Sequence, residues 1–463
     1  MTNWLKCALP AALLIMNISA VHADPASYKV AGAGNPILPG YYADPSYVEE
    51  DGKVYIFATL DPWGGDTLGC WESSDFRQWT YRVLNWPTKK ACTSATSQGA
   101  KVWAPSVVKG RDGKFYMYIS VGSEVWAGKA DHPLGPWKDA LGGGKPLIPS
   151  DYKPGYHMID AEAFIDDDGT AYLYWGSGLG WKNGKCWVVK LKPDMVTFDG
   201  EVKEVTPTNY FEGPFMVKHG GRYFLMYSQG ITKDDTYQVH YAVGATPFGP
   251  FTEGKNSPIL TTNKDTHVIS PGHHAVFVRN GEYYILYHRH SIPFDPKFIG
   301  RQMCVDRLVF TADGSIEKVV PTHTGPDLIQ KEPPSPLLAK AIATASGQKD
   351  ELRTPDSVLD RNYATSWAAP TDAKGAFLEL DLGSIKEISR QTIVPEYAWK
   401  PYRLRIEASD DRQTWKSVAD FTTAPAMGSP LVVSEKLSAR YIRLVFPESV
   451  KGSDIAIVEW DVR

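Results

Sequence analysis

The sequence of 463 residues predicts an all-β protein: a five-bladed β-propeller followed by a β-sandwich. Three observations support this fold class. A unit of two strands joined by a tight turn occurs five times, with its turn glycines at positions 52, 113, 169, 221 and 281. The 3.6-residue periodicity of amphipathic helices is essentially absent. Past a proline-rich stretch near residue 330 the repeat ends, but strand-like alternation continues. Radial repetition of a hairpin-bearing unit is typical of propellers.

The first copy, Tyr41–Thr59, shows how the unit is built. Asp51-Gly52 is a turn, because glycine accepts the positive φ of a type I′ hairpin. The β-branched and aromatic residues Val54–Phe57 form the returning strand. The later copies turn at Asp112-Gly113, Asp168-Gly169, Gly220-Gly221 and Asn280-Gly281. Each copy has an aromatic residue three positions after its glycine: Tyr55, Tyr116, Tyr172, Phe224 and Tyr284.

The chain divides into four parts. Residues 1–23 read as a secretory signal, with Lys6, an apolar stretch too short to span a bilayer, and small residues before the cleavage site; cleavage after Ala20 is the alternative. Residues 24–325 form the propeller, residues 326–336 a proline-stiffened linker, and residues 337–463 the β-sandwich. The mature protein is therefore expected to be exported, either to the periplasm or to the outside of the cell.

The composition limits the classes of partner. A formal net charge of −4 provides no electrostatic footprint for nucleic acid or an anionic membrane surface. No segment after the signal is long and apolar enough to insert into a membrane. The 15 Trp, 24 Tyr and 17 Phe fit an aromatic-rich β core, and some of them can also stack on sugar rings. We expect a monomer.

Removal of the signal segment, which contains Cys7, leaves four cysteines. Two interpretations of these four stay open. An oxidising compartment permits disulfides, and Cys70–Cys92 is the predicted pair because both lie in the outer part of the first blade. The alternative is four buried free thiols.

Acidic residues recur just before the inner hairpins. Eight or nine residues before the turn glycines stand Asp44, Ala104, Asp160, Glu212 and His273. The first strand of each propeller blade lies nearest the axis, so equivalent positions converge in one funnel. We therefore expect three carboxylates and an imidazole to face one another there.

Such a group suits the cleavage of a glycosidic bond. One carboxylic acid protonates the leaving oxygen, and one carboxylate activates water or attacks the anomeric carbon. A third carboxylate keeps the acid protonated by repulsion of like charge. Residues on opposite sides of a funnel are expected to lie farther apart than the roughly 5 Å of retaining enzymes, which favours inversion.

Six motifs carry a family resemblance over most of the mature chain: Ala43-Asp44-Pro45, Trp103-Ala104-Pro105, Ile159-Asp160, Glu212-Gly213-Pro214, Gly272-His273 and Gly300-Arg301-Gln302. From Tyr41 to about Gly325 the chain resembles glycoside hydrolase family 43, secreted inverting enzymes with a five-bladed propeller. The resemblance implies Asp44 as general base, Glu212 as general acid, and Asp160 as the residue that modulates the acid's pKa and orients the substrate.

The resemblance also implies binding roles. Arg301 would hold the sugar in the terminal subsite, and His273 would help to hold a structural calcium (or sodium) ion on the axis; no cofactor is required for the chemistry. The competing interpretations are His274 in place of His273, or a catalytic hydrogen bond made by His273. Trp103 and Trp63 are expected to stack on sugars, with a core position as the alternative for each.

The C-terminal part resembles the F5/8 type C, or discoidin-like, jelly-roll domains, which include family 32 carbohydrate-binding modules. The matching segments are Ala343–Ser346, Ala364–Trp367, Leu380–Gly383, Ser409–Asp411 and Ala439–Leu444. These are largely scaffold positions. The domain is either a carbohydrate-binding module, with Tyr397 and Trp399 as candidate stacking residues, or a structural cap on the propeller.

The expected function is an exported glycosidase that releases terminal α-L-arabinofuranosyl or β-D-xylosyl residues from plant-type glycans containing arabinose and xylose. A galactofuranosidase or galactosidase of the same fold is the nearest alternative. A non-catalytic glycan-binding propeller, or an adhesion protein led by the discoidin-like domain, are the alternatives from other classes.

Overall fold

The computed structural model describes residues 27–448 and 454–463. Their regular structure is almost entirely β, and among them there is no α-helix, as predicted. Five short 3₁₀ segments connect the strands: η1 (Ser27–Lys29), η2 (Leu179–Trp181), η3 (Asp327–Ile329), η4 (Pro336–Leu338) and η5 (Pro355–Leu359). Within the described ranges, no helix has the length and apolar character needed to cross a membrane. The predicted signal segment lies outside the described residues.

Five antiparallel sheets form the propeller. The first two blades are β1 (Tyr42–Glu50), β2 (Lys53–Leu60), β3 (Gly69–Ser73), β4 (Thr80–Arg82), and β5 (Val102–Lys109), β6 (Phe115–Val121), β7 (Glu124–Ala130), β8 (Lys138–Asp139). The third and fourth are β10 (Glu162–Ile165), β11 (Ala171–Trp175), β13 (Trp187–Leu191), β14 (Lys203–Glu204), and β15 (Glu212–His219), β16 (Arg222–Gln229), β17 (Gln238–Gly244), β18 (Thr252–Glu253). The fifth is β19 (Gly272–Arg279), β20 (Glu282–His290), β21 (Arg301–Leu308), and a separate short pair joins β9 (Tyr156–His157) to β12 (Ser177–Gly178).

The blades close into a ring around one axis. The first strands contact one another in the order β1, β5, β10, β15, β19 and back to β1. The N-terminal lead-in completes the fifth blade: the N–H of Ile37 donates to Met303 O at 2.8 Å, and Asn35 exchanges side-chain hydrogen bonds with Val305. The segment before β1 therefore covers the edge of β21, a strand edge that would otherwise be unpaired.

The inner hairpins use two kinds of turn. Asp51-Gly52, Gly220-Gly221 and Asn280-Gly281 have positive φ at both central residues, as type I′ turns require. In the second and third blades only Gly113 and Gly169 have positive φ. There the turns are longer, closed by hydrogen bonds such as that from Gly169 N to Asp166 O at 2.7 Å.

A β-bulge opens most of the first strands. In four of the five inner hairpins the pairing shifts just after the strand begins, beginning at Ala43, Trp103, Glu212 and Gly272. The residue at each of these bulges has a left-handed backbone, with φ of 52° at Asp44, 44° at Ala104, 61° at Gly213 and 37° at His273, and Asp160, just before β10, shares it with φ of 57°. A bulge re-aims the side chains beside it, and strained backbone of this kind gathers at functional sites.

This pairing corrects the predicted register in one blade. The structural equivalent of Asp44 in the fourth blade is Gly213, because its φ is also left-handed and it follows the paired Glu212 as Asp44 follows the paired Ala43. Glu212 lies one position earlier and pairs with Ser228, as Trp103 pairs with Ser120. The bulge still brings Glu212 to the funnel, because two successive residues share its distorted backbone.

The C-terminal domain is a sandwich of two sheets. One sheet runs in the order β22 (Ile342–Ala345), β24 (Ala376–Ile388), β29 (Leu437–Phe446), β26 (Arg405–Ser409), β27 (Lys416–Asp420). The other runs β23 (Trp367–Ala368), β30 (Ala456–Val462), β25 (Gln391–Pro395), β28 (Leu431–Val433). One apolar cluster fills the space between them, with Trp367 and Trp460 fully buried.

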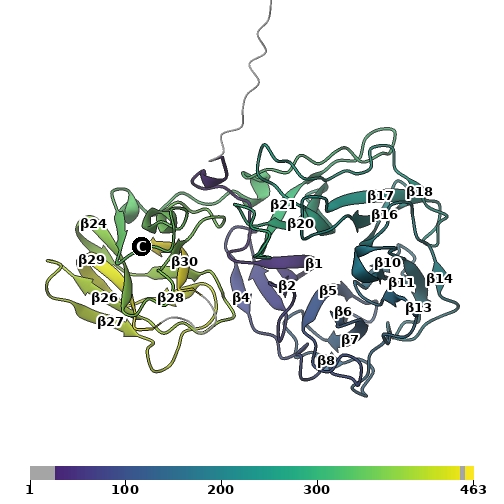
Figure 1. Cartoon of the computed structure of the whole chain (residues 1–463), viewed down its shortest axis with the longest axis horizontal. Helices are drawn as coiled ribbons and strands as arrows, with labels where there is room; N and C mark the ends of the chain where they lie inside the picture. The colour runs from purple at the N-terminus through teal and green to yellow at the C-terminus, as the bar shows by residue number, and fades with distance from the viewer. Residues whose placement is uncertain (1–26, 449–453) are drawn as a thin grey trace, which may run out of the picture.

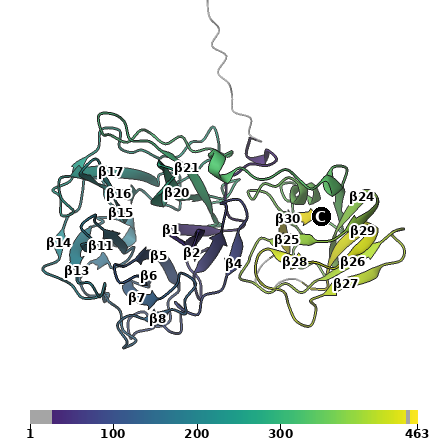
Figure 2. The same ribbon diagram turned by 180° about the vertical axis from the view of Figure 1, so that it is seen from behind.

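The sandwich packs against the first blade of the propeller, and both views show the two domains side by side, with β4 facing β28 (Figures 1 and 2). The N–H of Tyr81 in β4 donates to Ser429 O at 2.7 Å. The ring of Trp399 meets that of Tyr42 edge-on at 5.4 Å, and Ala398 is buried in the propeller's own apolar cluster. Trp399 is thus a packing residue at the domain junction, which contradicts its reading as a sugar platform.

The disulfide prediction is wrong. Cys70, Cys92, Cys186 and Cys304 are free and buried. Cys70 and Cys92 pack as small apolar side chains in the cluster shared by the first two blades, which is the alternative that the sequence left open.

Candidate active site

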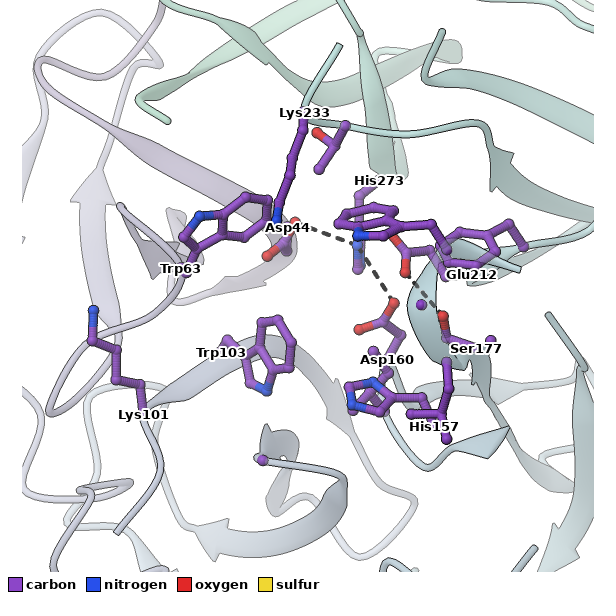
Figure 3. A pocket seen from close by; sticks show the side chains of 18 of the residues that line it. Asp44, Trp63, Lys101, Trp103, His157, Asp160, Ser177, Glu212, Lys233 and His273 are labelled. Carbon is purple, nitrogen blue, oxygen red and sulfur yellow. Dashed lines mark hydrogen bonds and ion pairs between the residues drawn. The ribbon is translucent and has the colours of Figure 1, made fainter. Parts of the chain in front are cut away.

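A cavity of about 460 Å³ opens where the first strands begin, and all seven predicted site residues line it. They are the three carboxylates Asp44, Asp160 and Glu212, together with Arg301, Trp63, Trp103 and His273. Figure 3 shows Asp44, Asp160 and Glu212 approaching the same space from three sides, with His273 between them. The funnel predicted from the repeat therefore exists.

Hydroxyl groups fix the backbone beneath these side chains. The N–H of Asp160 donates to Ser120 Oγ at 3.0 Å, that of His273 to Ser228 Oγ at 2.9 Å, and that of Ala104 to Thr59 Oγ1 at 2.7 Å. Each acceptor belongs to the second strand of the preceding blade. Sequence reasoning missed these residues, although each stands seven positions after its turn glycine.

Asp44 is buried and held in its ionised form. Its Oδ1 lies 3.0 Å from Arg301 Nη1, and its Oδ2 accepts from Thr59 Oγ1 at 2.7 Å. Burial by itself raises the pKa of this carboxyl, but Arg301, His273 and His288 outweigh it and bring the pKa well below the usual range. A carboxylate that remains charged at neutral pH can accept a proton from water.

Glu212 is in the opposite state. Burial is the largest influence and, with the negative charge of Asp44, raises the pKa of Glu212 to about 7. Its Oε1 accepts from Tyr237 OH at 2.7 Å and its Oε2 from Ser177 Oγ at 3.0 Å, and both bonds moderate the rise. Tyr237 and Ser177 were not predicted. A carboxyl with this pKa is largely protonated in mildly acidic solution and can donate a proton.

Asp160 is buried and lines the same cavity as the other two acids. Burial, followed by the charges of Glu212 and Asp44, raises the pKa of Asp160 well above its usual value. Nδ1 of His273 lies 3.3 Å from Asp44 Oδ1 and 3.8 Å from Asp160 Oδ2. Burial lowers the pKa of this imidazole, which favours its neutral form, and its Nδ1 lies nearer to Asp44 than to Asp160.

Asp61 holds Arg301 in place, and sequence reasoning missed it. Oδ2 of Asp61 accepts from the backbone N–H of Arg301 at 2.8 Å and from its Nε at 2.9 Å, while Oδ1 accepts from Nη2 at 2.7 Å. Both side chains are buried. The guanidinium is thereby left with Nη1 directed at Asp44. The sequence offers one signal that could have identified Asp61: it is an aspartate directly after β2, two residues before Trp63.

Aromatic side chains form one wall of the cavity. Trp63 lies 6.2 Å from Trp181, and the ring of Trp181 stacks on Phe211 at 5.7 Å. The Arg301 guanidinium lies 5.2 Å from the Trp63 ring, and Lys233 Nζ lies 5.4 Å from it. Figure 3 shows Lys233 reaching over the pocket beside Trp63.

Trp103 lies on the other side of the cavity, edge-on to His157 at 6.1 Å. Its indole N–H is buried and has no partner among the described residues. Both Trp63 and Trp103 therefore face the cavity and are not core residues.

The walls and the acids come from different parts of each blade. Asp44, Asp160 and Glu212 stand where first strands begin. Several wall residues stand on the connections between second and third strands, namely Trp63, Ser177, Trp181 and Lys233, whereas Trp103 lies in the first strand β5. Trp181 could have been found from this regularity, because its connection in the third blade corresponds to that of Trp63 in the first.

Few protein side chains around His273 are placed to bind a metal ion. Within residues 27–448 and 454–463, no three His, Cys, Asp or Glu side chains are grouped as metal ligands. Nδ1 of His273 faces the two carboxylates, whereas both ring nitrogens of the neighbouring His274 are buried and lack a partner among the described residues. The axial ion stays a prediction.

Comparisons with known proteins agree with this geometry. Residues 33–316 match the model of the glycosyl hydrolases family 43, and residues 342–459 match the F5/8 type C domain. The β-D-galactofuranosidase xynD of Aspergillus niger is 35% identical over 315 residues, 63% of this chain and 86% of that protein. An arabinoxylan arabinofuranohydrolase of Bacillus subtilis is 28% identical over 375 residues, 69% of this chain and 72% of that protein.

A solved structure described as a glycoside hydrolase matches the fold across both domains. It covers 94% of this chain and 100% of its own, with a TM-score of 0.78 and 28% identity.

Proposed function

The chain belongs to the glycosyl hydrolases of family 43, and we propose that it releases terminal α-L-arabinofuranosyl or β-D-xylosyl residues from arabinose- and xylose-containing glycans, with inversion at the anomeric carbon. The observation that carries the proposal is the opposite protonation of two carboxyl groups in one cavity. Asp44 is held ionised, whereas Glu212 has a pKa of about 7. Glycoside hydrolysis needs one group of each kind, and inversion is the stereochemical outcome that the family resemblance implies.

In the proposed reaction Glu212 donates its proton to the glycosidic oxygen as that bond breaks. Asp44 takes a proton from a water molecule, whose oxygen attacks the anomeric carbon from the opposite face. Asp160, whose pKa is raised by burial and by the two neighbouring carboxyl groups, orients the substrate beside Glu212 in this proposal. Arg301 orients the sugar, and the indoles of Trp63 and Trp103 provide faces for its C–H groups.

Support for a pentosyl substrate comes from the B. subtilis relative, whose name describes arabinofuranosyl release from arabinoxylan. Arabinofuranose and xylopyranose present similar hydroxyl layouts, so one pocket can serve both. A galactofuranosyl substrate is the second candidate, because the A. niger relative at 35% identity is a galactofuranosidase. A galactofuranosyl unit carries one more exocyclic carbon than an arabinofuranosyl unit, so the space around the terminal subsite decides between them.

Three further expectations belong to this proposal. The enzyme is exported after loss of residues 1–23, and it acts as a monomer. A calcium or sodium ion on the axis would be held by His273 and otherwise by water, and would supply positive potential beside the carboxylates. Metal analysis of the purified protein and of His273→Ala would check the ion without any activity measurement.

The test is a panel of nitrophenyl α-L-arabinofuranoside, β-D-xyloside and β-D-galactofuranoside with the wild type and Glu212→Gln. On an arabinoxylan oligosaccharide, whose sugar leaving group needs the acid, we expect the rate of hydrolysis to fall at least about 10³-fold in the variant. NMR should show the inverted anomer as the first product. Equal rates for wild type and variant on a natural oligosaccharide would contradict the proposal, and preference for the galactofuranoside would select the second candidate.

A further inference from the structure

A second cavity, of about 360 Å³, lies at the junction of the two domains. No residue that lines it also lines the active-site cavity. Its lining includes Tyr41, Phe298 and Gln302 of the propeller and Leu352, Arg353 and Glu396 of the sandwich. The sandwich contributes loops to this cavity, and the propeller contributes the segment that leads into β21. Neither domain encloses it alone.

Two buried acceptor atoms in this cavity need donors. Gln302 Oε1 and Glu396 Oε2 have no hydrogen-bond partner among the described residues, although each residue is only 3% exposed. They come from opposite domains and line the same space. A buried acceptor without a donor is costly, so a molecule that offers O–H groups is favoured there.

The remaining polar groups are already fixed in place. Arg353 Nη1 donates to Glu396 Oε1 at 2.9 Å, its Nη2 donates to Tyr41 OH at 3.1 Å, and Tyr41 OH donates to Glu396 Oε1 at 2.9 Å. This triad leaves Oε2 of Glu396 buried and without a hydrogen-bond partner among the described residues. A site whose groups are locked by their neighbours binds without paying a large ordering entropy.

The charge of the lining excludes anionic ligands. The described residues around the cavity provide four carboxylates and two cations: Asp295, Asp350, Glu396, Asp454, Lys349 and Arg353. The excess of negative charge repels an acidic polymer. Leu352 adds an apolar surface; it is 40% exposed and stands at the cavity with Phe298 and Tyr397. Hydroxyl donors combined with apolar C–H faces and no charge describe a neutral carbohydrate.

We propose that this junction cavity, defined by the residues named above, is a second glycan-binding site that takes an uncharged stretch of polysaccharide. The choice of arabinoxylan as the probe rests on the proposed function; the site itself does not. Binding there holds the enzyme on its polymer while the active-site funnel works on a terminal residue elsewhere on the chain. It also gives the sandwich domain a binding role that depends on contact with the propeller.

The test uses the full chain with Glu212→Gln, so that the polymer is not consumed, and compares Leu352→Glu with Ile385→Glu. Ile385 is an equally apolar residue of the same domain, 57% exposed and outside the cavity. Affinity electrophoresis in arabinoxylan should show retention that falls about tenfold for Leu352→Glu and is unchanged for Ile385→Glu. Polygalacturonate should not retain any of the three proteins.

A second measurement keeps the result independent of that one side chain. On addition of xylohexaose, amide hydrogen exchange in the Glu212→Gln protein should slow in peptides covering residues 291–300 and 349–366, apart from those of the active site. Unchanged exchange there, or equal retention of both Leu352→Glu and Ile385→Glu, would overturn the proposal. Failure to hydrolyse any nitrophenyl glycoside would instead count against the proposed function and leave the retention result standing.

Discussion

Asp61 grips Arg301 through three hydrogen bonds, so that the one remaining guanidinium nitrogen meets Asp44 at 3.0 Å. The two residues are 240 positions apart in the chain and belong to the first and the fifth blade. Their contact ties the ends of the propeller ring together. It also determines the charge state of Asp44, because Arg301 is the leading influence that lowers that pKa.

Loss of the hydrogen bonds between Asp61 and Arg301 should lower the activity of the enzyme. For Asp61→Asn we expect kcat/KM to fall about 10²-fold or more, because the buried Arg301 loses one of its two carboxylate partners and is no longer held in place. Asp66→Asn, an exposed aspartate of the same connection, should leave kcat/KM unchanged. Steady-state kinetics with a pentoside substrate and circular dichroism of both variants check this. A fully active, folded Asp61→Asn enzyme would contradict the role given to Asp61.

The pH dependence should follow the two carboxyl groups. Glu212 must be protonated, so kcat/KM should decline as the pH rises through about 7. Asp44 must be ionised, and because its pKa is well below the usual range, the acid side of the profile should stay flat to low pH until the protein unfolds.

The alkaline limb offers a direct check of this assignment. Ser177 donates to Glu212 and lowers its pKa, so Ser177→Ala should move the alkaline limb to higher pH. Ser94 donates a hydrogen bond to Glu124 outside the cavity. The control variant Ser94→Ala should therefore leave the alkaline limb of the pH profile unchanged. A limb that does not move in Ser177→Ala would show that another group titrates there.

Trp63 should act in binding more than in the chemical step. Its indole faces the cavity and lies 5.2 Å from the Arg301 guanidinium. Trp63→Ala should raise KM about tenfold with a smaller change in kcat, and Trp63→Phe should recover part of the loss, because a smaller ring still offers a face. A drop in kcat alone would place Trp63 in the chemistry instead.

The junction between the domains should be a source of stability. Trp399 packs on Tyr42 and lies beside Ala398, which is buried among propeller residues. Trp399→Ala should cost about 1–3 kcal/mol of unfolding free energy and separate one thermal transition into two. Trp415→Ala, in the same domain but away from the junction, should keep the transitions together. Calorimetry of both variants distinguishes these outcomes.

Much of this protein could be predicted from local chemistry. The turn dipeptides and the strands after them follow from the φ that glycine permits and from the packing of β-branched and aromatic residues. Because the unit repeats, equivalent positions had to meet around an axis. That argument was enough to name Asp44, Asp160 and Glu212 as neighbours, together with Arg301 once the family resemblance was added.

Other features were decided only when the chain closed on itself. The grip of Asp61 on Arg301, the hydroxyls of Ser177 and Tyr237 on Glu212, and the wall of Trp181 join residues with no shared local pattern. The register that places Glu212 one position earlier than Asp44 relative to the bulge is set by strand pairing, and the free state of Cys70 and Cys92 depends on how the core packs. Local sequence determines which strands and turns form, because those energies are set by near neighbours. The pKa values and contacts of the site are set by burial and by charges from distant blades, and those exist only in the folded ring.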